Sequence, residues 1–201
     1  LGSYVKGFLF VIWELVINQK THLNLAIYYS FTGRFDQAKE VLDLNWLLLY
    51  VPVYIFGIWL SYRLAVDLNK LTILAKREDS SIIPVKINSW EIAFLDKRVP
   101  WLAAVLSLLS PGLGQLYTHR VPISFFLMLD LIVVVYCANW LPALHYTLTG
   151  AFSQAAAILD PQWLLYFPSL IGFGIYDAYT NAVQYNRLFD EEQSRFLRKN
   201  Y

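Results

Sequence analysis

The chain repeats itself at a constant offset of 117 residues, and this repeat restricts its possible folds more than any other feature. Residues 29–71 align with residues 146–188 without a gap, most clearly between "YSFTGRFDQAKEVLDLNWLL" and "YTLTGAFSQAAAILDPQWLL". Polar residues and glycines recur together with apolar ones, which argues against a chance likeness of two apolar segments and indicates a duplication. The identical pairs include Thr32/Thr149, Gly33/Gly150, Phe35/Phe152, Gln37/Gln154, Asp43/Asp160, Trp46/Trp163, Gly57/Gly174 and Tyr62/Tyr179.

The composition assigns the repeat to a membrane protein. Hydrophobic residues make up 57% of the chain and charged residues only 15%, whereas soluble domains have roughly 45–50% and about 25%. Aromatic residues reach 17%, and amphipathic aromatic side chains are enriched at the two membrane–water interfaces of a bilayer. The net charge is only +1 and the basic residues form no stripe, so the lipid bilayer is the expected partner and nucleic acid is not.

Each repeat is predicted to form a helical hairpin that crosses the bilayer twice. A crossing needs about 20 residues, and the outgoing segments 7–28 and 121–145 and the returning segments 46–65 and 163–182 meet this requirement. The second half of 7–28 is the most polar part of these spans. We therefore expect an all-α integral membrane fold of two tandem hairpin repeats with four spans.

The distribution of lysine and arginine sets the expected orientation. Basic residues gather in the central segment 66–99 and in the C-terminal tail, whereas loop 146–162 has none. By the positive-inside rule, the linker and tail are expected in the cytoplasm and the duplicated loops outside the cell membrane. The two hairpins then share one direction, as in a parallel repeat.

Residues 100–116 are apolar but too short for a regular crossing, and "SPGLGQLY" interrupts them. A full crossing here would invert the second hairpin relative to the first, so we expect a re-entrant or interfacial segment. A fifth span is the alternative. The expected organisation is a first repeat (1–71) incomplete at its N-terminus, a cytoplasmic linker (72–99), the re-entrant element with the second repeat (100–188), and an amphipathic tail (189–201).

The duplicated loop has a helical pattern of its own. Phe152, Ala155, Ile158 and Leu159 share one helical face, and the first copy has the same arrangement. Such a short amphipathic helix fits the surface of the outer leaflet. The same apolar face would also fit over the outer ends of the spans, like a lid.

The stretch "SPGLGQLY" (110–117) contains the most specific local motif of the chain. Proline breaks the helix and the two glycines allow a tight turn and a close helix contact, while a nucleotide-binding loop lacks support because no strand precedes it. The motif residues are Pro111, Gly112, Gly114, Gln115 and Tyr117.

With "GIYDAY" at 174–179, this motif resembles a small two-helix membrane domain. The domain occurs in many uncharacterised bacterial proteins and in the N-terminal region of some maltose-type sugar ABC permeases. The resemblance covers about residues 100–188, with a degenerate copy in 1–71, and it implies a fold rather than an activity. The glutamate-alanine-alanine loop by which such permeases engage their ATPase is not found in this sequence, so a transporter core is not implied.

Three carboxylates within the predicted spans, Glu14, Asp130 and Asp177, are the candidate intramembrane polar site. Ionisable groups are costly in hydrocarbon and therefore face a partner or a cavity. One interpretation is an ion or proton site, or a hydrogen bond between helices that serves the function. The other is a structural partnership with Asn18, tyrosines or backbone N–H groups, or an interfacial position for Asp177.

No catalytic, metal-binding or cofactor-binding pattern accompanies these carboxylates. His22, His119 and His145 lack ligand spacing, and Cys137 is the only cysteine. We therefore expect a non-catalytic protein without metal or cofactor. The function that fits best is an accessory or scaffolding subunit that packs against other membrane subunits or against itself. The alternative is a small transporter or channel with a path at the repeat interface near Glu14 and Asp130.

Overall fold

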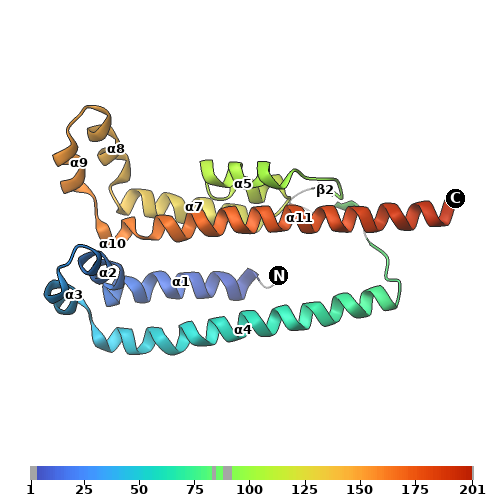
Figure 1. The fold of residues 1–201 in the computed structure, drawn as a ribbon, viewed down its shortest axis with the longest axis horizontal. Coiled ribbons are helices and arrows are strands. Elements are labelled where there is room, and N and C mark those ends of the chain that lie inside the picture. The colour runs from blue at the N-terminus through green and yellow to red at the C-terminus, as the bar shows by residue number, and fades with distance from the viewer. Residues whose placement is uncertain (1–3, 83–84, 88–91, 201) are drawn as a thin grey trace. The chain divides into compact units, whose positions relative to one another are not determined.

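A computed structural model describes residues 4–82, 85–87 and 92–200. Helices dominate these residues, in agreement with the expected all-α class (Figure 1). Within the described ranges, the two strands form one short antiparallel pair, in which Val85 lies opposite Phe94. The elements are α1 (Tyr4–Thr21), α2 (Leu23–Phe31), α3 (Phe35–Val41), α4 (Leu44–Arg77), β1 (Val85–Ile87), β2 (Ile92–Phe94), α5 (Pro100–Leu109), α6 (Leu113–Tyr117), α7 (Val121–Cys137), α8 (Trp140–Leu148), α9 (Phe152–Ile158), α10 (Pro161–Leu164) and α11 (Tyr166–Asn200).

The chain divides into two compact units, which do not follow the boundary between the sequence repeats. The first unit comprises Leu1–Glu78 and Ile132–Phe167, and the second comprises Asp79–Leu131 and Pro168–Tyr201. The first unit therefore contains the duplicated loops of both copies. The second contains the Pro-Gly-Leu-Gly motif and most of α11.

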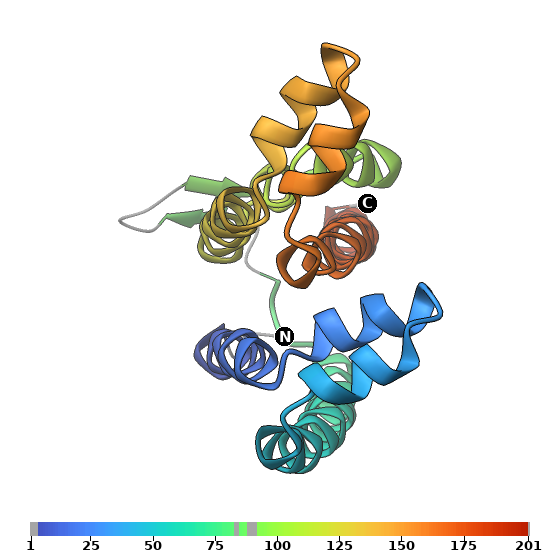
Figure 2. The ribbon, with the colours of Figure 1, turned by 90° about the vertical axis from the view of Figure 1, so that its left-hand side faces the viewer.

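The observed helices recur at the offset of the sequence repeat. Helices α2 and α3 have the same bounds as α8 and α9 when 117 residues are added, and each pair forms a helical hairpin (Figure 2). The residue before each hairpin has a left-handed backbone, with φ of 53° at His22 and 54° at Asn139. The turn within each hairpin has a glycine at positive φ, Gly33 at 75° and Gly150 at 80°, a conformation that glycine adopts at little cost.

Both hairpins are closed at the base by the same contacts. The backbone N–H of Asp43 donates to the carbonyl of Thr21 at 3.1 Å, and that of Asp160 donates to Ala138 at 3.2 Å. Each aspartate then caps the following helix, because its side chain accepts from the N–H groups two and three residues further on. The duplicated loop is thus a compact insertion whose two ends meet.

The predicted outgoing spans differ from the observed helices at one point in each copy. Segment 121–145 is not one straight helix, because α7 and α8 meet at an angle of 63°. Segment 7–28 is likewise interrupted at His22. The left-handed residue turns its peptide groups out of the helical hydrogen-bond pattern, and asparagine tolerates this conformation better than most residues.

The returning helices are longer than predicted, and the linker has structure of its own. Helix α4 continues beyond 65 and past the expected linker start at 72, and α11 continues through the expected tail boundary at 189. Helix-favouring residues and pairs such as Arg63–Asp67 and Lys70–Asp67, both 4.0 Å apart, extend α4. Within the expected linker, residues 85–87 form β1, which pairs with β2.

One helix in the described residues, α4, is long and apolar enough to cross a membrane. The bent pair α7–α8 passes the same test when it is taken as one broken span, and α5 is a shorter apolar helix. None of the most apolar part of α4 is buried inside the protein. This weakly indicates association with a membrane.

A buried polar cluster connects the two copies within the first unit. The Gln162 amide donates to the Asn18 side chain at 2.9 Å, and its oxygen accepts from the backbone N–H of Leu25 at 2.6 Å. Asn24 donates to the backbone carbonyl of Gln162 at 3.0 Å. Because buried amides need hydrogen-bond partners, this cluster fixes the start of α10 against the break between α1 and α2.

Candidate functional site

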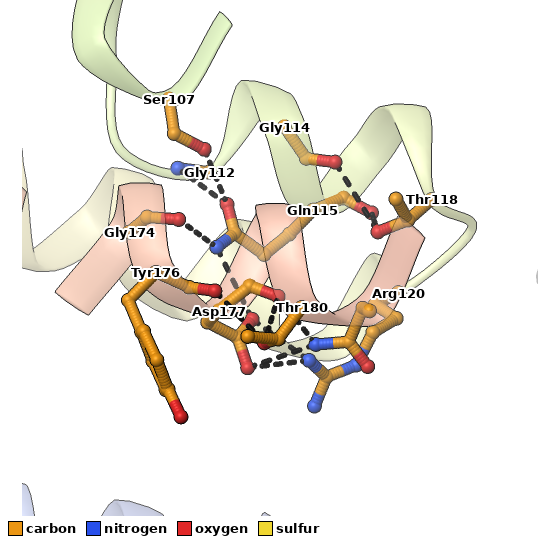
Figure 3. A network of polar contacts seen from close by, with 11 residues as sticks. Ser107, Gly112, Gly114, Gln115, Thr118, Arg120, Gly174, Tyr176, Asp177 and Thr180 are labelled. Carbon is orange, nitrogen blue, oxygen red and sulfur yellow. Dashed lines mark hydrogen bonds and ion pairs between the residues drawn. The ribbon is translucent and has the colours of Figure 1, made fainter. Parts of the chain in front are cut away.

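The polar contacts of the second unit centre on one buried glutamine of the Pro-Gly-Leu-Gly-Gln motif. Gln115 is fully buried. Its side-chain oxygen accepts from the Gly112 N–H at 3.2 Å and from the Ser107 hydroxyl at 3.3 Å. Its amide nitrogen donates to the Gly174 carbonyl at 2.9 Å and to Asp177 Oδ2 at 3.2 Å (Figure 3). One side chain therefore joins α5, α6 and α11.

Asp177 continues this arrangement as the acceptor of an ion pair. Arg120 Nη1 lies 2.6 Å from Asp177 Oδ1 and 2.7 Å from Oδ2 (Figure 3). The two side chains are only 12% and 15% exposed, so water screens their attraction little. Asn181 also donates to Asp177 Oδ1, at 3.1 Å. We call Gln115, Arg120, Asp177 and Asn181 the motif network.

Two glycines allow the backbone to approach closely around the motif network. Gly112 has a φ of 108°, and a Cβ there would lie 2.7 Å from the Ser124 carbonyl. A Cβ on Gly114 would overlap the Ser107 hydroxyl and the Ala103 carbonyl and would lie 2.7 Å from the Ala178 Cβ. Gly114 and Ala178, which is fully buried, let α6 and α11 touch almost backbone to backbone.

A second set of contacts lies about two and a half helical turns beyond Asp177 on α11. The Asn186 amide accepts from the Arg98 N–H at 2.7 Å and donates to the Arg98 carbonyl at 2.8 Å. The Arg98 side chain stacks over the Tyr117 ring at 5.2 Å and lies 2.7 Å from His119 Nε2. The Tyr117 hydroxyl accepts from the Val99 N–H at 3.1 Å. The motif tyrosine thereby holds the segment that enters α5.

The three carboxylates singled out in the sequence have different surroundings. Asp177 lies in the motif network with a cationic partner. Glu14 is half-buried on α1, close enough to the Tyr50 hydroxyl of α4 to interact with it electrostatically. Asp130 is half-buried on α7, and the structure gives it no hydrogen bond or ion pair with any described residue. Asn18, a proposed partner for these acids, instead binds Gln162 and Asn24.

The three histidines lie in three different places in the fold. His22 forms the break before α2, His119 contacts Arg98, and His145 packs beside Tyr146 on α8. Among residues 4–82, 85–87 and 92–200, no group of three or more histidine, cysteine or acidic side chains is arranged to hold a metal ion.

Sequence reasoning missed Arg120 as the partner of Asp177 and missed Gln162 entirely. Arg120 lies three residues after the last motif residue, Tyr117, and a carboxylate in the returning helix was a signal that a nearby cation was needed. Gln162 gave no such signal, because its copy-related residue is Asn45, which is exposed. Its role appears only once the hairpin base is folded.

No protein-family model matches this chain, and neither does any curated protein or solved structure. The resemblance to the two-helix membrane domain therefore rests on the motif residues alone.

Replacing Gln115 with leucine is expected to destabilise the second unit by about 1–3 kcal/mol, because the buried Gly112 N–H loses its acceptor. The same substitution at Gln154, which is exposed on α9, is the matched control and should have little effect. Unfolding in detergent micelles, followed by circular dichroism, measures both. Equal midpoints for the two variants would show that the Gln115 hydrogen bonds contribute nothing to stability.

Proposed function

We propose that this chain is a multi-pass protein of the cell membrane with a non-catalytic, scaffolding or accessory role in a larger membrane complex. The observation that carries the proposal is the exposed apolar surface of α4. Large side chains such as Leu48, Ile55 and Trp59 are more than half exposed along this helix. A soluble monomer rarely presents so continuous an apolar surface, whereas lipid or another apolar helix covers it without cost.

Four spans in two parallel hairpins are the proposed architecture, supported by the helices that recur at the offset of 117. Helices α4 and α11 have 34 and 35 residues, or about 50 Å at 1.5 Å per residue. This length exceeds a hydrocarbon core of about 30 Å, so both helices emerge from the bilayer. Their charged C-terminal halves, together with the linker, lie in the cytoplasm under the positive-inside rule.

The proposed role as a subunit rests on how the polar groups of the motif are used. In the motif network, Gln115 and Asp177 both bind neighbouring elements of the same chain. The network thus stabilises the fold and presents no open polar site. The fold presents an apolar helical surface to other molecules. Within membranes, helices associate at such surfaces through close packing and small residues.

Purification in a mild detergent tests the subunit role. The chain is expected to co-purify with a membrane protein in fixed stoichiometry, or as a defined oligomer of itself. A double substitution on α4, Leu48→Lys with Ile55→Lys, should abolish this association, whereas Lys70→Gln on the same helix should not. A monodisperse monomer that retains no partner would contradict the proposal.

A small transporter or channel is the second candidate, favoured by the half-buried Asp130 that lacks a partner among the described residues. A carboxylate in this condition inside a membrane is costly unless it serves an ion or solute path. Ion flux into liposomes should then fall to background in the double variant Glu14→Gln with Asp130→Asn. Unchanged or absent flux in the wild-type and variant liposomes would exclude this candidate.

A further inference from the structure

The turns of the two helical hairpins have the same exposed apolar tip. Phe31 and Phe35 flank the turn between α2 and α3 and are 86% and 61% exposed. Leu148 and Phe152 flank the turn between α8 and α9 and are 78% and 67% exposed. The four positions correspond at the offset of 117, so each hairpin presents two large apolar side chains at the same place. We call these four residues the hairpin tips.

The rest of the surface differs between the two hairpins. An overall similarity of the two copies therefore does not explain why both have an apolar tip. Helix α3 has Asp36, Lys39 and Glu40 where α9 has Ser153, Ala156 and Ala157. Charge on the hairpin therefore varies between the copies, while the apolar tip is retained. Isolated apolar residues on a surface need no explanation, but a matched pair in both copies indicates that the two tips share one environment.

Helix lengths place the hairpins at the depth of the membrane interface. Helix α7 has 17 residues, or about 26 Å, which is close to the thickness of the hydrocarbon core of about 30 Å. An outgoing helix that starts at the cytoplasmic side therefore ends near the outer interface. Its break at His22 or Asn139 lies there, and the hairpin follows.

The bend then keeps the second hairpin within the interface. Helix α8 turns by 63° from α7, so it runs closer to the membrane plane than to its normal. Nine residues of α8 span about 13 Å, of which only about 6 Å is directed along the axis of α7. This displacement is similar to the thickness of one headgroup region, about 5–7 Å.

We infer that the hairpin tips insert into the outer leaflet at the boundary between lipid headgroups and acyl chains. This inference rests on the proposed membrane function. The chemistry fits that boundary, because amphipathic elements bury phenylalanine and leucine there. Arg34 stacks near Tyr28 and Tyr29 at 6.0 and 5.7 Å, and these residues supply the mixed aromatic and cationic rim typical of an interface. The tips thereby anchor the outer ends of the spans to the lipid.

Spin labels on single cysteines test this inference in liposomes of phosphatidylcholine and phosphatidylglycerol. All variants have Cys137→Ser, and the labelled positions are Phe35→Cys and Phe152→Cys. The matched controls are Gln37→Cys and Gln154→Cys, which are exposed and lie about 200° around the same short helices. Collision of the label with oxygen, which concentrates in lipid, is compared with collision with a water-soluble nickel chelate. The oxygen-to-nickel ratio is expected to be severalfold higher at the two phenylalanine positions than at the two glutamine positions.

A label at Ile55 of α4 separates failure of this inference from failure of the proposed function. If Ile55 contacts lipid while the tips contact water, the inference is wrong and the membrane function stands. If Ile55 also contacts water, both are wrong. Tips that neither reagent reaches would be covered by protein, as in a lid, and would equally overturn the inference. Phe31→Cys and Leu148→Cys provide a second label position, one at each tip.

Discussion

Replacing Asp177 with alanine is expected to destabilise the second unit by about 3–5 kcal/mol, because it removes the carboxylate that forms an ion pair with the nearly enclosed Arg120 guanidinium. Arg120 Nη1 contacts both carboxylate oxygens of Asp177, and the pair is nearly enclosed. Gln115 would lose one of its two acceptors in the same substitution. The unfolding midpoint in detergent micelles, followed by circular dichroism, should fall accordingly.

The double variant Arg120→Met with Asp177→Leu is the control for this prediction. It removes both charges of this ion pair together, and its loss of stability should be well below that of Asp177→Ala. If the double variant loses as much stability as the single variant, the shape of the site matters and its charge does not. If Asp177→Ala unfolds at the wild-type midpoint, Arg120 finds water easily and the site is not enclosed.

Adding one methyl group at Gly114 is expected to be nearly as damaging. Its Cβ would overlap the Ala103 carbonyl, which belongs to the backbone of α5 and cannot rotate away. The helices must therefore separate, and Gly114→Ala should cost about 3 kcal/mol, at the upper end of the usual cost of overpacking. The midpoint of unfolding reports this loss.

Gly172 of α11 provides the matched comparison in the same unit. A Cβ there meets nothing within 4 Å, so Gly172→Ala should be neutral or should stabilise the helix by about 0.5–1 kcal/mol. A loss of stability at Gly114 and a gain at Gly172 would distinguish the effect of close packing from the effect of helix propensity. Similar effects at both positions would mean that α6 does not approach α11 as closely as the structure shows.

The sequence predicts the helical class of this chain because the patterns involved are local. Apolar runs, the aspartates before α4 and α10, and the Thr-Gly turns all act within a few residues of themselves. The recurrence at 117 residues adds a strong constraint, because whatever one copy does locally, the other is expected to do. The observed bounds of α2, α3, α8 and α9 follow this expectation residue by residue.

The parts that were missed depend on contacts between distant segments or on weak local signals. Arg120 and Asp177 are 57 residues apart, and they meet only because the glycines let α6 lie against α11. The break at Asn139 was hidden in a continuous apolar run, although asparagine three residues before Pro142 was a signal for it. His22 offered a weaker signal, because no proline follows it in the next few residues.

The candidate site was only partly visible from the sequence for the same reason. Polar residues in apolar helices identified Asp177 as a position in need of a partner. The sequence pattern did not distinguish Asp177 from Asp130, for which the described residues supply no partner. That distinction depends on which face of each helix is covered, and coverage is a property of the folded chain.

The side of the membrane on which each segment lies is the decisive measurement for the proposed multi-pass architecture. Single cysteines at Ser153 of α9 and Ser194 of α11, both exposed, are introduced in a Cys137→Ser background and treated with a membrane-impermeant maleimide. Ser153→Cys is expected to react in intact cells, and Ser194→Cys only after the membrane is permeabilised. Reaction of Ser194→Cys in intact cells, or protection of Ser153→Cys until permeabilisation, would contradict the proposed topology.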